Sequence, residues 1–101
     1  MSDFRYEEFK VEDQRETVRN ELRSYEQQHA ARAADVEKFS QLIAAHDRGD
    51  FAQWDKRILV DRVRDWGLQR SSAHIDVASM ELLIANAKER LKALGGESAE
   101  E

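Results

Sequence analysis

The chain has 101 residues, with 16 Lys and Arg against 21 Asp and Glu, a formal net charge of −5, and neither Pro nor Cys. At this length one domain is expected, because two hydrophobic cores do not fit. The absence of Cys excludes disulfides, thiolate zinc sites, iron–sulfur clusters and cysteine nucleophiles. The absence of Pro, together with only four Gly, is typical of long helices and not of a turn-rich β fold.

The negative charge is unevenly distributed along the chain. Residues 97–101 hold three acids and no base, whereas residues 47–70 hold five acids and six bases. Such interspersed signs favour salt-bridged helix faces and do not favour nucleic-acid binding. No apolar run approaches the roughly 18–20 residues of a membrane span, and residues 1–10 lack the apolar core of a signal peptide. We therefore expect a cytoplasmic protein without membrane association, whose acidic tail (97–101) is disordered.

The first long segment, from about residue 7 to residue 46, has a heptad pattern. Its repeating positions alternate spacings of four and three, and seven of the eleven are apolar: Val11, Arg15, Val18, Leu22, Tyr25, His29, Arg32, Val36, Phe39, Ile43 and His46. This spacing predicts a helix with one coiled-coil contact face, called seam 1 below.

A turn is predicted at residues 47–50. Gly49 can adopt the left-handed conformation that ends a helix, and Asp50 is a good N-cap for a second helix over about 51–66. Gly67, followed by Ser71 and Ser72, weakens helix locally, so we predict a kink or a break there and a last helix over about 72–94. The alternative is one continuous helix that tolerates Gly67 at a cost of about 1 kcal/mol.

The last predicted helix is apolar on two stripes. Seam 2 comprises Val77, Met80, Ile84, Ala87, Leu91 and Leu94, and the outer stripe beside it comprises Ile75, Ala78, Leu82 and Ala85. Because one partner helix cannot cover both, the pattern predicts self-association. The expected fold is all-α: a single domain over 1–96, folded as an antiparallel coiled-coil-like helical hairpin that assembles into an oligomeric helix bundle. The residues expected at subunit or partner interfaces are Phe4, Tyr6, Phe9, Val77, Met80, Leu83, Ile84 and Leu91.

A hairpin that turns at residues 48–49 also predicts a register. Residues equally distant from the turn lie at one height, so Leu22 is expected near Ile75, and Phe39 near Ile58. The same register places Arg32 opposite Asp65, in a stretch where both arms lose apolar character. The polar residues expected at this level are Glu26, His29, Arg32, Asp65 and Arg70.

This polar level has two interpretations. It is either a polar layer that fixes register and oligomeric state, or a pocket in which Arg32 and Arg70 bind a small anionic ligand such as a nucleotide. A third alternative is a carboxylate–histidine metal bundle, because Glu26-x-x-His29 matches the ligand spacing of such sites.

The sequence contains no catalytic constellation. There is no Gly-rich phosphate loop, no Gly-x-Ser-x-Gly turn and no Cys–His pair. We therefore expect a non-enzymatic protein without a cofactor, whose partners are itself and another protein.

Overall fold

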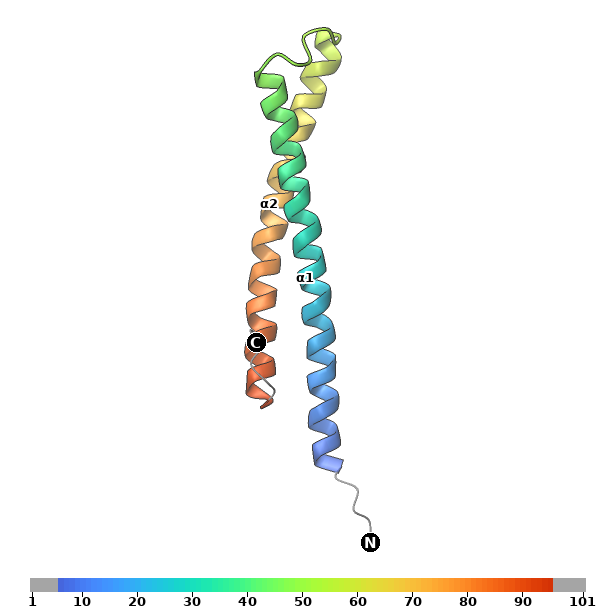
Figure 1. Cartoon of the computed structure of the whole chain (residues 1–101), viewed down its shortest axis with the longest axis vertical. Coiled ribbons are helices and arrows are strands. Elements are labelled where there is room, and N and C mark those ends of the chain that lie inside the picture. Colours follow the sequence, from blue (N-terminus) through green and yellow to red (C-terminus); the bar gives the residue numbers. More distant parts are fainter. Residues whose placement is uncertain (1–5, 96–101) are drawn as a thin grey trace. The chain divides into compact units, whose positions relative to one another are not determined.

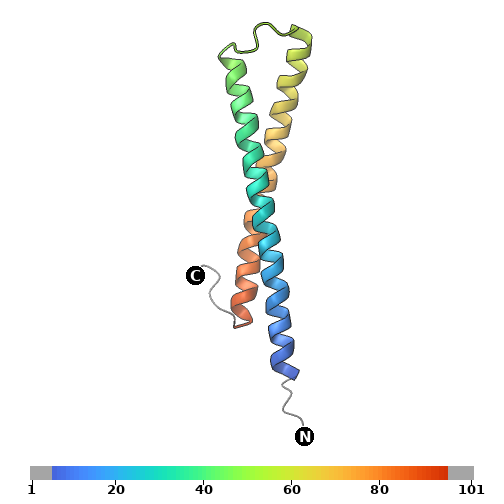
Figure 2. The same cartoon turned by 45° about the vertical axis from the view of Figure 1, so that its right-hand side comes forward.

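The computed structural model describes residues 6–95, and within them it has two helices, α1 (Tyr6–Asp47) and α2 (Lys56–Ala93). The helices form a hairpin joined by residues 48–55 (Figures 1 and 2). They make two packing units: residues 6–28 with 80–95 form unit 1, and residues 29–79 form unit 2. The all-α hairpin is thus confirmed. The tail 97–101 lies outside the described residues.

The end of α1 is a Schellman motif at Gly49. Gly49 has φ +85°, its N–H donates to the His46 carbonyl at 2.9 Å, and the Asp50 N–H donates to the Ala45 carbonyl at 3.0 Å. These bonds satisfy carbonyls that a helix end otherwise leaves unpaired. The predicted helix end at Gly49 is therefore confirmed, and Arg48 and Asp50 on either side pair with each other at 2.8 Å.

The start of α2 lies later than predicted. Asp55, not Asp50, is the N-cap: its Oδ1 accepts from the Arg57 N–H at 2.8 Å, and its carbonyl accepts from the Leu59 N–H at 2.9 Å. Residues 51–55 consequently belong to the connection, which is longer than the predicted turn. Phe51 lies in this connection, and its ring packs on that of Trp66 with 5.4 Å between centroids.

The predicted break at Gly67 is absent, because α2 is continuous from Lys56 to Ala93. Gly67 lacks the positive φ of Gly49 and Gly95, and a Cβ built on it meets nothing within 4 Å. Burial of the neighbouring Trp66, which is 7% exposed, outweighs the low helix propensity of one glycine.

Replacing Gly67 with Ala is therefore expected to stabilise the protein by about 0.5–1 kcal/mol, since Ala loses less backbone entropy and meets no obstacle. Thermal unfolding followed by circular dichroism measures the change. Gly49→Ala is the control, and it should destabilise because its φ is positive. A lower melting temperature for Gly67→Ala would contradict the prediction, because it would mean that the helix needs a glycine at position 67.

The core of unit 1 is small and apolar. Val18 is 5% exposed, Ala87 0% and Leu91 2%, and Leu22, Tyr25 and Leu94 pack around them. The unit is closed on one side by an ion pair at 2.7 Å between Arg90 Nη2 and Glu21 Oε1. The predicted seams therefore meet each other here, as expected for antiparallel helices.

The core of unit 2 centres on Trp66 and Ala73, which are 7% and 0% exposed. Phe51 from the connection covers Trp66, and Trp54 contacts Phe51 edge-to-face at 5.0 Å between ring centroids. In both units every member of seam 1 is at least partly buried, and so is every member of seam 2. The seven-residue pattern thus identified the inward faces of both helices.

The predicted register is wrong. Arg32 pairs with Asp76, eleven residues beyond the expected Asp65. Ile58 and Ile75, which were expected to contact Phe39 and Leu22, are 53% and 66% exposed. The longer connection shifts α2, and the shift moves a different set of its residues onto seam 1.

Candidate functional site

The predicted polar level is an ion-pair network within unit 2. Arg32 Nε donates to Asp76 Oδ2 at 2.8 Å, and Arg32 Nη1 donates to Asp35 Oδ2 at 2.6 Å. The Arg32 side chain is 30% exposed, and its guanidinium has a carboxylate on two sides. Its charge is therefore compensated by the protein itself, which leaves little for an anionic ligand.

The other residues predicted at this level do not join Arg32 in the same network. Arg70 lies six residues before Asp76 on α2, about 9 Å along a helix, and Asp65 and Glu26 are exposed. His29 is partly buried on seam 1. Among the described residues no three His, Cys, Asp or Glu side chains gather as a metal site requires. Neither Asp35 nor Asp76 was predicted at this level. Asp35 lies three residues after Arg32 on the same helix, where such pairs are common, whereas Asp76 could be found only with the true register.

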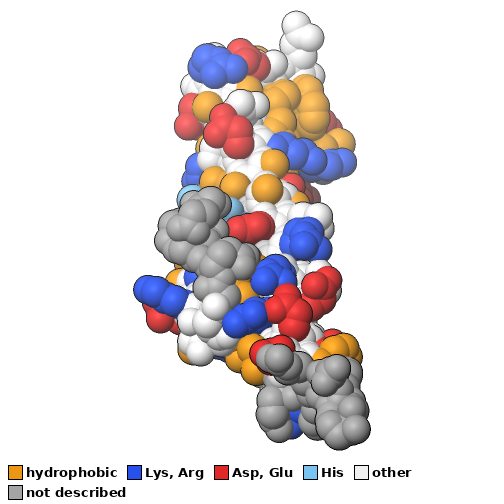
Figure 3. Space-filling model, turned by 60° about the horizontal axis from the view of Figure 1, so that its bottom comes forward, with side chains coloured by type: hydrophobic (Ala, Val, Ile, Leu, Met, Phe, Trp, Pro, Cys, Tyr) orange, Lys and Arg blue, Asp and Glu red, His pale blue; other side chains and the backbone are white. Residues whose placement is uncertain are grey.

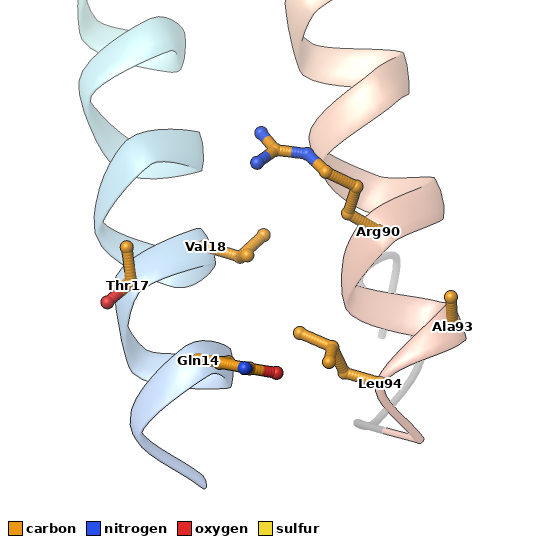
Figure 4. Close-up of a pocket in the computed structure, with 6 residues that line it drawn as sticks. All are labelled: Gln14, Thr17, Val18, Arg90, Ala93 and Leu94. Carbon is orange, nitrogen blue, oxygen red and sulfur yellow. The ribbon is translucent and has the colours of Figure 1, made fainter. Parts of the chain in front are cut away.

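An open apolar groove of about 400 Å³ lies in unit 1, lined by Gln14, Thr17, Val18, Arg90, Ala93 and Leu94. Gln14 and Val18 of α1 point toward α2, and Leu94 points back toward them (Figure 4). Only Val18 is buried, and the Arg90 guanidinium is held by Glu21. The groove therefore offers apolar surface and no uncompensated charge.

Arg15 ties the two helices together at the same end of unit 1. Its Nε donates to the Leu94 carbonyl at 3.0 Å, next to Gly95, whose positive φ ends α2. This bond satisfies a carbonyl at the negative end of the helix dipole. Arg15 Nη1 also donates to Glu12 Oε1 at 2.8 Å, and this hydrogen bond lowers the pKa of Glu12, with a smaller contribution from Arg19.

The lowered pKa of Glu12 predicts a pH signature for Arg15. A carboxylate whose pKa is depressed on folding adds stability above its ordinary value of 4.5, and that stability is lost as pH falls through the lowered pKa. Arg15→Met should therefore destabilise more at pH 7 than at pH 3, as measured by urea unfolding. Arg23→Met is the control, because Arg23 donates to the neutral Asn20 Oδ1 at 2.8 Å. An equal loss at both pH values would contradict the Glu12 assignment.

The predicted interface residues separate into two groups. Leu91 is 2% exposed and belongs to the core of unit 1, so its assignment to a partner interface was wrong. Val77, Met80 and Ile84 are partly buried on seam 2. Leu83 and Phe9 remain 38% and 57% exposed. Phe4 and the side chain of Tyr6 lie outside the described part of the chain.

Among the described residues, an uncovered apolar feature is the outer stripe of α2. Leu68 and Ile75 in unit 2 are 65% and 66% exposed, and Leu82 in unit 1 is 74% exposed. These three residues recur every seven positions. Each is followed three positions later by a small exposed residue, namely Ser71, Ala78 and Ala85. Leu68 was not part of the predicted stripe, and its exposure extends the stripe by one heptad. From here on, the outer stripe denotes these six residues.

The stripe lies on the face of α2 that does not contact α1. In unit 2 the buried Trp66 and Ala73 alternate with the exposed Leu68 and Ile75, and at 100° per residue the two sets lie on roughly opposite sides of the helix. Elsewhere on the surface, acidic and basic side chains are interspersed on the face that Figure 3 shows.

Comparisons of the chain with protein-family models, with curated proteins and with solved structures gave no match. Neither described helix is long and apolar enough to cross a membrane.

Proposed function

We propose that the chain is a small non-enzymatic helical module that self-associates and binds another protein, acting as an adaptor, a scaffold or an inhibitor. The observation that carries this proposal is the exposure of Leu68, Ile75 and Leu82, each at least 65%. An uncovered apolar face of this kind marks an interaction site in soluble proteins. Its seven-residue spacing is that of a helix that packs on a second helix.

The free energy that burial of the stripe would contribute is large compared with the folding stability of a small domain. Full burial of one Leu or Ile side chain contributes about 1.5–3 kcal/mol, and three such side chains stand in one row. Total folding stabilities are about 5–15 kcal/mol. A partner helix on the stripe would therefore add stability comparable to that of the isolated hairpin.

The connection end of unit 2 offers a second apolar surface. Trp54, Ile58 and Val60 are 43%, 53% and 63% exposed. None of the three belongs to the six residues of the outer stripe. We assign contacts with a different protein to this end.

The test of the proposed function is a triple substitution in the stripe, Leu68→Ser, Ile75→Ser and Leu82→Ser. Sedimentation velocity should show that self-association is lost, while circular dichroism shows that the helices persist. The matched control is Phe9→Ser, Ile58→Ser and Val60→Ser, which removes three exposed apolar side chains elsewhere and should still self-associate. Unchanged association of the stripe variant would refute the proposal.

A further inference from the structure

We infer that the outer stripe is covered by a second copy of this chain, whose α2 lies antiparallel about a twofold axis between residues 76 and 77. This inference rests on the proposed function and specifies its partner. It follows from the order of side chains along α2, which is one continuous helix over the whole stripe.

Large and small side chains match in this arrangement. A residue of one copy faces the residue equally distant from the midpoint in the other copy. Ile75 then faces Ala78, Leu82 faces Ser71 and Leu68 faces Ala85, and twofold symmetry repeats each match. A large side chain meets a small one at all six levels, so the helices can approach closely without a void or a clash.

The charges beyond the stripe match as well. The next positions of the same heptad face are Asp61 and Arg64 before it and Glu89 and Lys92 after it. In the antiparallel arrangement Arg64 faces Glu89 of the second copy, and Asp61 faces its Lys92. All four are exposed in the single chain, where Arg64 Nη2 also donates to Asp61 Oδ1 at 2.8 Å. Opposite charges at both ends of an apolar stripe fix register.

Other alignments lose these matches. A parallel pair in register places Arg64 on Arg64 and Glu89 on Glu89, and like charges in contact are unfavourable. If the second copy is shifted by one heptad in the antiparallel arrangement, a charged side chain faces an apolar one. Arg64 then faces Leu82 for one direction of the shift, and Lys92 faces Leu68 for the other. The sequence of α2 therefore favours one orientation and one register.

Cysteine cross-linking tests the arrangement in the full chain, which has no native Cys. We expect a mixture of the single variants Leu68→Cys and Ala85→Cys to form a disulfide-linked dimer on mild oxidation, because a bridge requires Cα atoms within about 7 Å. Each variant alone should remain uncross-linked, because the two copies of one position lie about 26 Å apart along the helices.

Two results would overturn the arrangement. Cross-linking of Leu68→Cys with itself would show parallel helices. A mixture that stays uncross-linked while light scattering reports a dimer would show a different register or surface. The stripe variant of the proposed function separates the two failures: if it still loses self-association, only the orientation or register is wrong, and if it still associates, the proposed function fails as well.

Charge reversal provides an independent test of the register. Arg64→Glu should raise the dimer dissociation constant at least about tenfold, because two symmetric attractions become repulsions. Glu89→Arg should do the same, and the double variant should recover near wild-type association. Arg62→Glu is the control: it lies two positions from Arg64, about 200° around the helix, and should have little effect. A double variant as weak as the single ones would refute the pairing.

Discussion

Replacing Trp66 with Ala is expected to destabilise unit 2 by about 3–5 kcal/mol, as for other buried large aromatic residues. Trp66 is 7% exposed and is the large side chain on which Phe51 packs. Its removal leaves a cavity between α2 and the connection, and the Phe51 ring loses its partner. Because small domains have only about 5–15 kcal/mol of stability, much of unit 2 should unfold under mild denaturation.

The control for this prediction is Trp54→Ala. Trp54 contacts the same Phe51 ring but is 43% exposed, so its loss should cost clearly less than the loss of Trp66. Urea unfolding followed by far-ultraviolet circular dichroism compares the two variants directly. Equal losses would mean that ring stacking at the connection, and not burial beneath it, stabilises this end.

Replacing Leu91 with Ala is expected to cost about 2–5 kcal/mol in unit 1. Leu91 is 2% exposed between Val18 and Ala87, and the small side chain of Ala87 cannot refill the space. The measurement is the same urea unfolding, with the residues of unit 1 followed separately by amide hydrogen exchange.

Leu83→Ala is the matched control for Leu91, since it makes the same change on the same helix at a position 38% exposed. Its cost should be clearly smaller than that of Leu91, because 38% of its surface is already exposed to solvent. A larger loss at Leu83 than at Leu91 would contradict the packing of unit 1.

The inward faces of both helices were predictable from the sequence because they follow from periodicity. The three-and-four spacing of seam 1 places every member on one side of a helix, and the structure buries each at least partly. The end of α1 was predictable for a similar local reason, since Gly49 can adopt a positive φ at little cost.

The start of α2 and the register were not predictable by the same means. Asp50 and Asp55 are equally good N-caps in local terms, and the choice of Asp55 depends on the packing of Phe51 against Trp66. That contact joins residues on opposite sides of the cap, so no local pattern shows it. Once α2 began later, Arg32 faced Asp76 instead of Asp65.

The candidate interaction surface was predictable only in part. The sequence showed that α2 has more apolar surface than one neighbour can cover, but it placed Leu91 at the interface and omitted Leu68. Assignment of each residue to the inner or outer face required the true position of α1, because the two apolar stripes of α2 resemble each other in composition.

The most direct test of the central claim is the mass of the unaltered chain in solution. Multi-angle light scattering at low micromolar concentration should give about twice the chain mass of 11.7 kDa, which is the mass that the proposed pairing of two outer stripes requires. A mass of one chain at that concentration, with the helices intact, would contradict the claim that α2 presents a self-association surface.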